Sequence, residues 1–305
     1  MKAVTLTNIT KTYNEGAVLA VDKLSFEVEK GELFGLIGPD GAGKTTIFRL
    51  LTTLLLADSG TATVDGFDIV KDFKSIRKKV GYMPGKFSLY QDLTVEENLN
   101  FFATIFGTTI QENYELIKDI YVQIEPFKTR RAGKLSGGMK QKLALSCALI
   151  HKPTVLFLDE PTTGVDTVSR KEFWEMLKRL KAQGITILVS TPYMDEANLC
   201  DRIALMQSGK ILSINTPDNI TKAYDGKLYA IRSSSMHKLL IELRNYEYIE
   251  SCFAFGEYLH ITFKKDHINH TNALLSHLKH NGHTHIELKT IEPSIEDCFI
   301  KLLKQ

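Results

Sequence analysis

Short apolar runs alternate with stretches of helical periodicity along the first two thirds of the chain. The runs 33–37, 154–158 and 185–189 are almost wholly apolar, which is typical of strands buried on both faces. The segment that follows residue 45 repeats apolar residues at helical spacing instead, at Ile47, Leu50, Leu51 and Leu54. Strands that alternate with helices predict an α/β domain with a largely parallel core sheet.

The same patterns place further elements between these. We expect a helix over 170–183 that ends at Gly184, and a capping box of Thr94 and Glu97 that opens a helix reaching Phe106. Residues 108–135 are expected to be mostly helical. Further strands are expected at 3–7, 24–28, 61–64 and 80–83, and further helices at 74–79 and 143–149.

Composition changes near residues 217–226, beyond which eight of the nine histidines lie. The pattern there is strand, helix, two strands, helix and strand, which predicts a small split-βαβ domain. Its expected elements are strands at 228–232, 251–255, 258–263 and 286–289, helices at 236–244 and 270–279, and a terminal helix capped by Ser294. For 305 residues we therefore expect two domains, residues 1–220 and 225–305.

Charge and composition narrow the classes of partner. The 38 basic and 36 acidic residues give a net charge of +2, so nucleic acid is not expected as a partner. No apolar run approaches the roughly 18–20 residues needed to cross a bilayer, and no signal-peptide segment is expected at the N-terminus. The four cysteines lie far apart, which indicates reduced thiols in a cytosolic protein rather than disulfides or a zinc site.

A glycine-rich stretch between the strand 33–37 and the following helix carries the clearest chemistry. It satisfies G-x-x-x-x-G-K-[ST], whose backbone N–H groups and helix N-terminus form a cradle for phosphates. Lys44 is expected to reach the β- and γ-phosphates of ATP, and the Thr45 hydroxyl to bind Mg²⁺. The candidate ATP-binding residues of this phosphate loop are Gly38, Pro39, Asp40, Gly41, Ala42, Gly43, Lys44, Thr45 and Thr46.

Two acids close the apolar strand at 154–158. Asp159 at that strand end is expected to help hold Mg²⁺, as in other phosphate-loop ATPases. Glu160 follows it and can orient and polarise the attacking water, which is the general-base role. A solvated turn is the alternative, and the phosphate loop upstream argues against it.

Two further motifs bear a resemblance to a known family. Residues 135–141 (LSGGMKQ) resemble the signature of ABC ATPases, and 159–166 (DEPTTGVD) resembles the family's segment that ends in the D-loop. With the phosphate loop, these are three motifs in the family's order over roughly residues 1–215. The resemblance implies an α/β P-loop NTPase of ABC type, with a mixed core sheet, an antiparallel β subdomain and a helical signature subdomain, followed by a small α+β domain.

The resemblance also implies an ATPase that works as a head-to-tail dimer. Each ATP then lies between the phosphate loop of one subunit and the signature of the other. In this sequence the signature residues acting in trans are Ser136, Gly137, Gly138 and Gln141, and the D-loop residue is Asp166. Ser136 and its two glycines stand at a helix N-terminus, a second anion-binding site with no use inside its own subunit. Tyr13 matches the aromatic residue that stacks on adenine.

Two positions depart from the family pattern. Gly85 stands where the family usually has a Gln that reaches Mg²⁺ and the water, and Pro192 stands where it usually has a His that contacts the γ-phosphate. ATP binding should survive, but turnover in the subunit's own site should be slower, by ~10²–10³-fold for the loss of one transition-state contact. The intact signature would still serve an opposite site, so a weakly hydrolysing partner in an asymmetric heterodimer is an alternative.

The family's transporters imply the remaining expectations. We expect a subunit that powers an ABC exporter through a separate membrane permease, held peripherally at the cytoplasmic face of the membrane. The apolar segment 87–106 is expected to dock on that permease, although ordinary core packing explains it as well. The second domain is expected to be accessory or regulatory. A metal site at His277, His280, His283 and His285 is a weaker alternative to a polar surface.

Overall fold

The computed structural model describes residues 1–264 and 270–304. The chain divides into two compact units, Met1–Asp218 and Asn219–Gln305. The first unit holds every motif discussed above, and the second holds the histidine-rich segment. Each unit has its own core, so each is described by itself.

The first unit is built around a mixed sheet in the order β10-β9-β3-β8-β7-β6. Its parallel strands are β3 (Leu33–Ile37), β6 (Val80–Met83), β7 (Val155–Asp159), β8 (Thr186–Thr191) and β9 (Arg202–Gln207), and β10 (Lys210–Asn215) is antiparallel to β9. Every residue of β3, β7 and β8 is buried, as their apolar runs predict. The hydrophobic pattern predicted no strands at the positions of β9 and β10.

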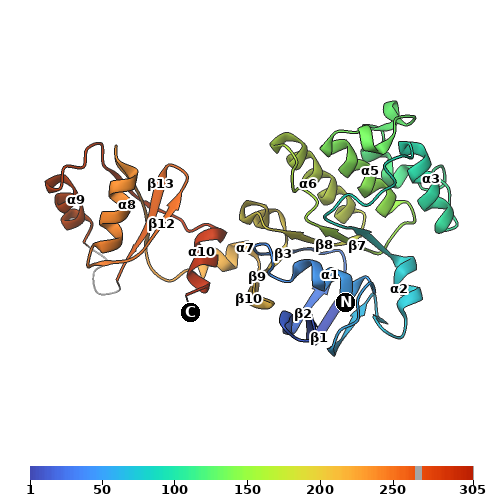
Figure 1. Cartoon of the computed structure of the whole chain (residues 1–305), viewed down its shortest axis with the longest axis horizontal. Helices are drawn as coiled ribbons and strands as arrows, with labels where there is room; N and C mark the ends of the chain where they lie inside the picture. The colour runs from blue at the N-terminus through green and yellow to red at the C-terminus, as the bar shows by residue number, and fades with distance from the viewer. Residues whose placement is uncertain (265–269, 305) are drawn as a thin grey trace. The chain divides into compact units, whose positions relative to one another are not determined.

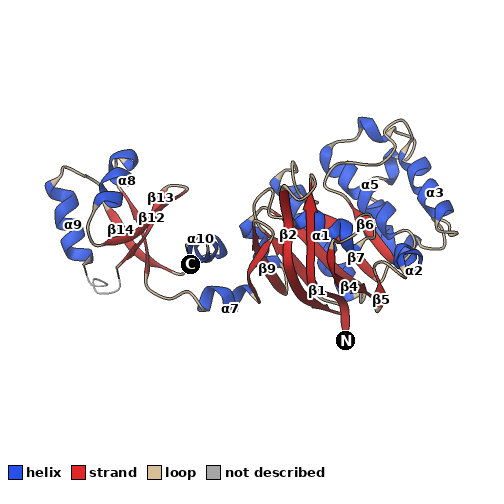
Figure 2. Cartoon of the chain, turned by 60° about the horizontal axis from the view of Figure 1, so that its bottom comes forward, coloured by secondary structure: helices blue, strands red, loops and turns tan. Residues whose placement is uncertain are grey.

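An antiparallel sheet lies on one side of this mixed sheet, with helix α1 (Lys44–Leu51) near both (Figures 1 and 2). Its order is β2-β1-β4-β5, with β1 at Lys2–Tyr13, β2 at Val18–Glu29, β4 at Ser59–Val64 and β5 at Phe67–Asp68. Phe48 of α1 meets Phe157 of β7 edge to face at 5.5 Å within the shared core. The predicted continuation of α1 to Leu54 is wrong: the helix ends at Leu51, and Leu54 is 58% exposed.

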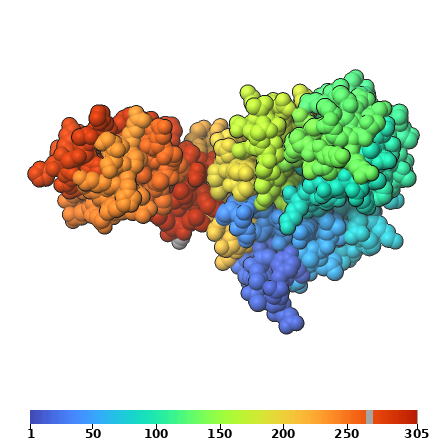
Figure 3. Space-filling view, turned by 45° about the horizontal axis from the view of Figure 1, so that its top comes forward, coloured from blue at the N-terminus to red at the C-terminus, as the bar shows by residue number. Residues whose placement is uncertain are grey.

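A helical segment forms a separate lobe of the first unit, coloured green in Figure 3. It contains α3 (Val95–Ile105), α4 (Tyr114–Tyr121) and α5 (Gly137–Leu149), and the predicted capping box of Thr94 and Glu97 is present. The prediction that 108–135 is mostly helical overstates the helix. Only α4 and two short 3₁₀ turns, Glu125–Phe127 and Ala132–Lys134, form there. Pro126, which has no N–H to donate, lies in the first of these turns.

The other helical elements of this unit flank the mixed sheet. They are α2 (Phe73–Lys79), α6 (Thr167–Ala182) and a 3₁₀ turn at Met194–Leu199. Helix α6 begins three residues earlier than the pattern predicted, because Asp166 caps it by accepting bonds from the N–H groups of Val168 and Ser169. None of the helices in the described ranges is long and apolar enough to cross a membrane.

The second unit is an antiparallel sheet with helices, and its element order matches the predicted split-βαβ pattern. Helix α7 (Pro217–Lys222) leads into β11 (Leu228–Arg232), α8 (Met236–Asn245), β12 (Ile249–Phe255), β13 (Tyr258–Phe263), α9 (Thr271–His280), β14 (Glu287–Ile291) and α10 (Ile295–Leu302). The sheet order is β12-β13-β11-β14. Leu239 and Leu243 of α8 and Leu274 and Leu278 of α9 pack on one sheet face. Ser294 caps α10 in a capping box with Asp297.

Candidate active site

The phosphate loop runs from the end of β3 to the start of α1, as the motif requires. Its backbone passes so close to other strands that side chains are excluded at two points. A Cβ on Gly38 would lie 2.3 Å from the Met206 carbonyl oxygen, and one on Gly43 would lie 2.4 Å from that of Ala20. Gly43 also has a φ of +101°. The glycines are therefore required by packing as well as by the loop conformation.

Lys44 reaches back over this loop with its side chain buried. Its ammonium donates to the carbonyl oxygens of Gly38 (2.8 Å) and Pro39 (3.0 Å) and lies 3.3 Å from a carboxylate oxygen of Glu160. The side chain of Lys44 is 2% exposed and that of Glu160 is 23% exposed. The cation and the candidate general base thus face each other across the loop.

Three oxygen-bearing side chains meet beside Lys44. The Thr45 hydroxyl donates to Asp159 Oδ1 at 3.2 Å, and the Ser190 hydroxyl donates to the same atom at 2.6 Å. Asp159 is 2% exposed. Hydroxyl and carboxylate oxygens are the hard ligands that Mg²⁺ prefers, so these residues fit the ion. Ser190 has no motif of its own and was not among the predicted residues.

Glu160 is held in an uncommon backbone conformation. Its φ is +49°, and its N–H lies 3.0 Å from the Ser190 carbonyl oxygen and 3.1 Å from the Ser190 hydroxyl oxygen. A non-glycine residue in the left-handed region costs of order 1–3 kcal/mol, and such residues cluster at functional sites. The β8 strand therefore holds this strained turn in place.

The remaining predicted nucleotide contacts lie around the same loop. The Tyr13 hydroxyl is 3.3 Å from Thr46 Oγ1, which brings the end of β1 to the start of α1. Ala42 is buried and its carbonyl oxygen accepts from the Gly209 N–H at 3.0 Å. Asp40 and Gly41 are exposed at the tip of the loop.

The signature lies apart from this cluster. Ser136 caps α5, its hydroxyl accepting from the Met139 N–H at 3.3 Å, and is exposed. Gly138 lies near Ser169 on α6, and Gly137 near Gly164. Across the described residues, no hydrogen bond or ion pair joins 136–141, including Gln141, to 38–46. The structure therefore does not bring the signature onto the phosphate loop of its own chain.

The D-loop residue Asp166 binds Ser169, which lies near Gly138 of the signature. Hydrogen bonds from the Ser169 N–H, then from the Ser169 hydroxyl and the Val168 N–H, lower the pKa of the Asp166 carboxyl. At neutral pH the exposed carboxylate is therefore ionised and accepts hydrogen bonds at the N-terminus of α6. Gly164 and Ser169, which lie near Gly137 and Gly138, bring the D-loop and the signature together.

The two departures from the family pattern are Gly85, which faces the cluster, and Pro192, which follows β8. A Cβ on Gly85 would lie 3.1 Å from the Asp159 carbonyl oxygen and 3.7 Å from Glu160 Cβ, so position 85 faces the acids. Pro192 directly follows β8, whose last residue is Thr191. Neither Gly85 nor Pro192 has a side chain that can hydrogen-bond to a phosphate or water.

A buried carboxylate that the sequence patterns did not single out connects these segments. Glu196 is 2% exposed and accepts from the hydroxyls of Thr162 (2.8 Å) and Thr191 (2.6 Å) and from the Arg170 guanidinium (2.9 Å). It therefore ties the turn after Glu160 to the end of β8 and to the first turns of α6. An acid within a short turn carries no periodic signal, so only its tertiary contacts identify it.

The candidate histidine metal site is not assembled. Glu242 of α8 lies 3.0 Å from His277 Nε2 and 2.9 Å from His283 Nε2, although the sequence indicated no nearby acid. His283 also contacts the Ser233 hydroxyl through Nδ1 at 3.2 Å. Within 1–264 and 270–304, no group of three or more histidine, cysteine or acidic side chains is placed to hold a metal ion.

Taken together, the fold and these contacts define a class. A phosphate loop, an acid pair at the end of a neighbouring parallel strand, and a capped signature helix occur in one α/β unit with an antiparallel sheet and a helical lobe. This is the class of nucleotide-binding cassettes.

The chain belongs to the ABC transporter family, among its ATP-binding components. The ABC transporter sequence profile matches residues 21–163. The Nod factor export ATP-binding protein I of Rhizobium sp. (strain N33) is 35% identical over 305 residues, covering 98% of this chain and 96% of that protein. These matches confirm the predicted resemblance to the ABC ATPases. The predicted ATPase activity is confirmed as the activity of this family.

Two further similar proteins show how much of the chain the match covers. The probable multidrug ABC transporter ATP-binding protein YbhF of Escherichia coli (strain K12) is 39% identical over 98% of this chain, and the chain spans 52% of its length. A dimeric ATP-binding cassette, solved in a post-hydrolysis state with ADP and phosphate, is 26% identical with a TM-score of 0.64. It covers 70% of this chain and 98% of its own, which confirms the predicted fold class.

Proposed function

We propose that this chain binds and hydrolyses ATP between two subunits and thereby powers export through a separate membrane permease. The observation that carries the proposal is the separation within one chain of the phosphate loop from the exposed, Ser136-capped tip of α5. A helix tip that can bind an anion completes a nucleotide site only when a second subunit supplies it. The dimeric cassette described above supports this pairing.

The chemistry follows from the contacts around the phosphate loop. Lys44 and the loop N–H groups bind the phosphates, and Thr45 and Asp159 hold Mg²⁺, which neutralises charge on the phosphates. Glu160 orients and polarises the attacking water, and Ser190 fixes both acids in place. The Glu160 carboxylate is freed for this task when the phosphates replace it beside the Lys44 ammonium.

Ser136→Arg is expected to abolish ATP-dependent dimerisation while leaving the monomer folded and able to bind ATP. Ser136 is exposed, so the monomer can accommodate the larger side chain, whereas a closed interface cannot. Light scattering on a sizing column, with and without MgATP, measures the dimer, and nucleotide titration measures binding.

Ser136→Ala is the matched control for this experiment. It removes the cap on the Met139 N–H, at a cost of about 0.5–2 kcal/mol, without adding bulk. The control should still dimerise. Equal dimerisation of Ser136→Arg and the unmodified chain would contradict the proposed interface.

A second candidate function is a weakly hydrolysing partner in an asymmetric heterodimer. Gly85 and Pro192 favour it, because position 85 faces the acids, Pro192 directly follows β8, and neither residue has a hydrogen-bonding side chain. Mg²⁺ and ATP binding would be retained, and the intact signature and Asp166 would serve the other subunit's site.

The double variant Gly85→Gln with Pro192→His separates these functions. If the chain is the weak partner, the variant should raise kcat of the purified chain, by about 10²-fold for each transition-state contact regained. Steady-state phosphate release measures kcat. The pair Gly85→Ala with Pro192→Ala controls for backbone effects, since any Cβ at position 85 meets the Asp159 carbonyl oxygen at 3.1 Å. High turnover by the unmodified chain would instead exclude the heterodimer.

We assign the surface that docks on the permease to the helical lobe. Tyr90 (51% exposed), Phe101 (37%) and Ile105 (59%) lie at its surface, and the rings of Tyr90 and Phe101 meet at 4.8 Å. Leu89 is buried and belongs to the core instead. An exposed apolar cluster of this kind marks an interaction site and would hold the chain at the cytoplasmic face of the membrane.

The assignment of roles to the two domains is also a proposal. Residues 1–220 are the ATP-binding domain, and 225–305 are an accessory, regulatory domain. The names of the relatives, which refer to multidrug transport, Nod factor export and linearmycin resistance, support export as the direction of transport.

A further inference from the structure

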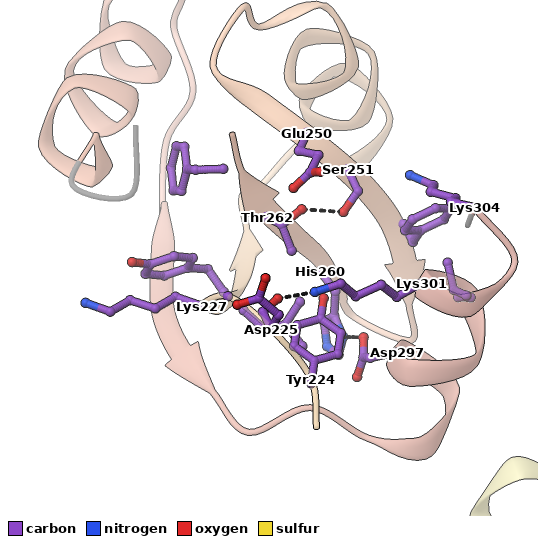
Figure 4. Close-up of a pocket in the computed structure, with 16 residues that line it drawn as sticks. Tyr224, Asp225, Lys227, Glu250, Ser251, His260, Thr262, Asp297, Lys301 and Lys304 are labelled. Atoms are coloured by element: carbon purple, nitrogen blue, oxygen red, sulfur yellow. Dashed lines mark hydrogen bonds and ion pairs between the residues drawn. The ribbon is translucent and has the colours of Figure 1, made fainter. Parts of the chain in front are cut away.

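The second unit contains a cavity that the proposed ATPase function does not use. It has a volume of about 480 Å³, within the range of sites that hold small molecules. Strands β11, β12 and β13 and helix α10 provide its lining, together with the loop at 224–227 (Figure 4). Every lining residue belongs to this unit, so the cavity is a property of the unit alone.

The wall formed by α10 is fixed to the sheet. His260 Nδ1 lies 2.7 Å from Asp297 Oδ1, and Asp297, which is 5% exposed, also accepts from the N–H and hydroxyl of Ser294. Because Asp297 acts as the acceptor, His260 Nδ1 carries the proton. The side chains that α10 turns toward the cavity are therefore held in place relative to the strands.

Three lysines and three acids line the cavity, the acids being Asp225, Glu250 and Asp297. Lys227, Lys301 and Lys304 line it, and in the part of the chain that the structure describes none of them lies within 4.0 Å of a carboxylate. Lys301 donates to the Asp225 carbonyl oxygen and lies 4.2 Å from the centre of the Tyr224 ring. Lys304 lies 4.7 Å from the centre of the Phe253 ring. A carbonyl oxygen and ring faces satisfy these ammonium groups only in part.

Between these charged groups the lining includes an apolar wall and a pair of hydroxyls. Leu228, Phe253 and Ile300 provide carbon surface, and Figure 4 shows Ser251 and Thr262 joined on the sheet. Their hydroxyl oxygens are 2.7 Å apart. One hydroxyl donates to the other, so one proton remains for a bound acceptor. Unpaired cations, a hydroxyl donor and apolar walls together define a site for a molecule with an acidic head and an apolar body.

We propose that this cavity binds a soluble, anionic amphiphile, with its acidic group at Lys301 and Lys304 and its apolar body against Leu228, Phe253 and Ile300. Glu250 lines the same cavity and opposes an anion there. Substitutions of opposite charge should therefore change the affinity in opposite directions. Removing the Glu250 charge should strengthen binding, whereas removing the lysine charges should weaken it. The proposal is independent of ATP turnover, because it concerns binding alone.

Isothermal titration of the full chain with monomeric dodecanoate tests the site, with saturating MgADP present to occupy the phosphate loop. We expect one dodecanoate per chain. Lys301→Ala with Lys304→Ala should lower its affinity by about tenfold, and Glu250→Gln should raise it by about two- to fivefold, as expected for partly exposed charges. The doubly substituted Lys301→Arg and Lys304→Arg chain should keep the affinity.

The matched control is Lys289→Ala. Lys289 also lies over an aromatic ring, 4.1 Å from the centre of Tyr258, but it does not line the cavity, so its loss should leave the affinity unchanged. Dodecyltrimethylammonium should not bind. Equal binding of that cation, unchanged affinity after removal of both lysines in a chain that melts normally, or binding only to phosphatidylglycerol vesicles would overturn the proposal.

Discussion

Lys44→Ala is expected to lower the affinity for MgATP by about 30-fold or more, because removing one partner from a buried charged contact costs about 2–5 kcal/mol. The Lys44 ammonium is the buried cation in contact with the loop and is already directed at its carbonyl oxygens. Once a phosphate replaces Glu160 beside it, the same ammonium supplies the countercharge. Titration with a fluorescent ATP analogue measures the affinity.

Two further variants separate the loss of the Lys44 charge from other effects of the substitution. Lys44→Met retains the apolar stem and separates loss of charge from loss of packing, and its melting temperature shows whether the loop still folds. Lys171→Ala, at an exposed position of α6, is the control for removal of a surface cation. If Lys44→Met folds normally and binds MgATP as tightly as the unmodified chain, the phosphate loop is not the nucleotide site.

Glu160→Gln is expected to lower kcat by about 10²–10⁴-fold while ATP binding persists. The amide has the same shape as the carboxylate but cannot accept the proton of the attacking water. The backbone of residue 160 is held through its N–H by Ser190, so the turn should survive the substitution. Bound ATP should then accumulate with the dimer, which phosphate release and light scattering measure on the same sample.

Glu175→Gln is the matched control for this variant. Glu175 is an exposed acid of α6 that pairs with Lys178 at 2.9 Å, well outside the site. Its loss should leave kcat unchanged. An undiminished kcat in Glu160→Gln would mean that another group activates the water, and the assignment of Glu160 as the general base would be withdrawn.

The two effects differ because the side chains act at different stages. In the proposed function Lys44 contacts the phosphates whenever ATP is bound, so its loss is expected in the affinity. Glu160 is proposed to act on a water molecule during hydrolysis, so its loss is expected in kcat. Ser190 contributes to both stages, since its hydroxyl binds Asp159 and its carbonyl oxygen binds the Glu160 N–H.

The sequence by itself determined the features that depend on neighbours along the chain. The phosphate loop, the capping box at Thr94, the N-cap at Ser294, and the buried strands β3, β7 and β8 follow from turn chemistry, from contacts three residues apart and from apolar periodicity. The family motifs then identified the fold class, which the relatives confirm. The roles of the individual site residues stay predictions.

Only the tertiary structure decided which distant side chains meet. Thr45 and Asp159 are 114 residues apart and meet directly. Ser190 also reaches Asp159, because β8 lies between β3 and β7 in the sheet. Glu196 binds Thr162, Arg170 and Thr191 through the same arrangement. Lys304 likewise meets Phe253 of β12 only because the C-terminal segment folds back onto the sheet. Such contacts leave no periodic trace, since they depend on strand order, and no local pattern of residues encodes that order.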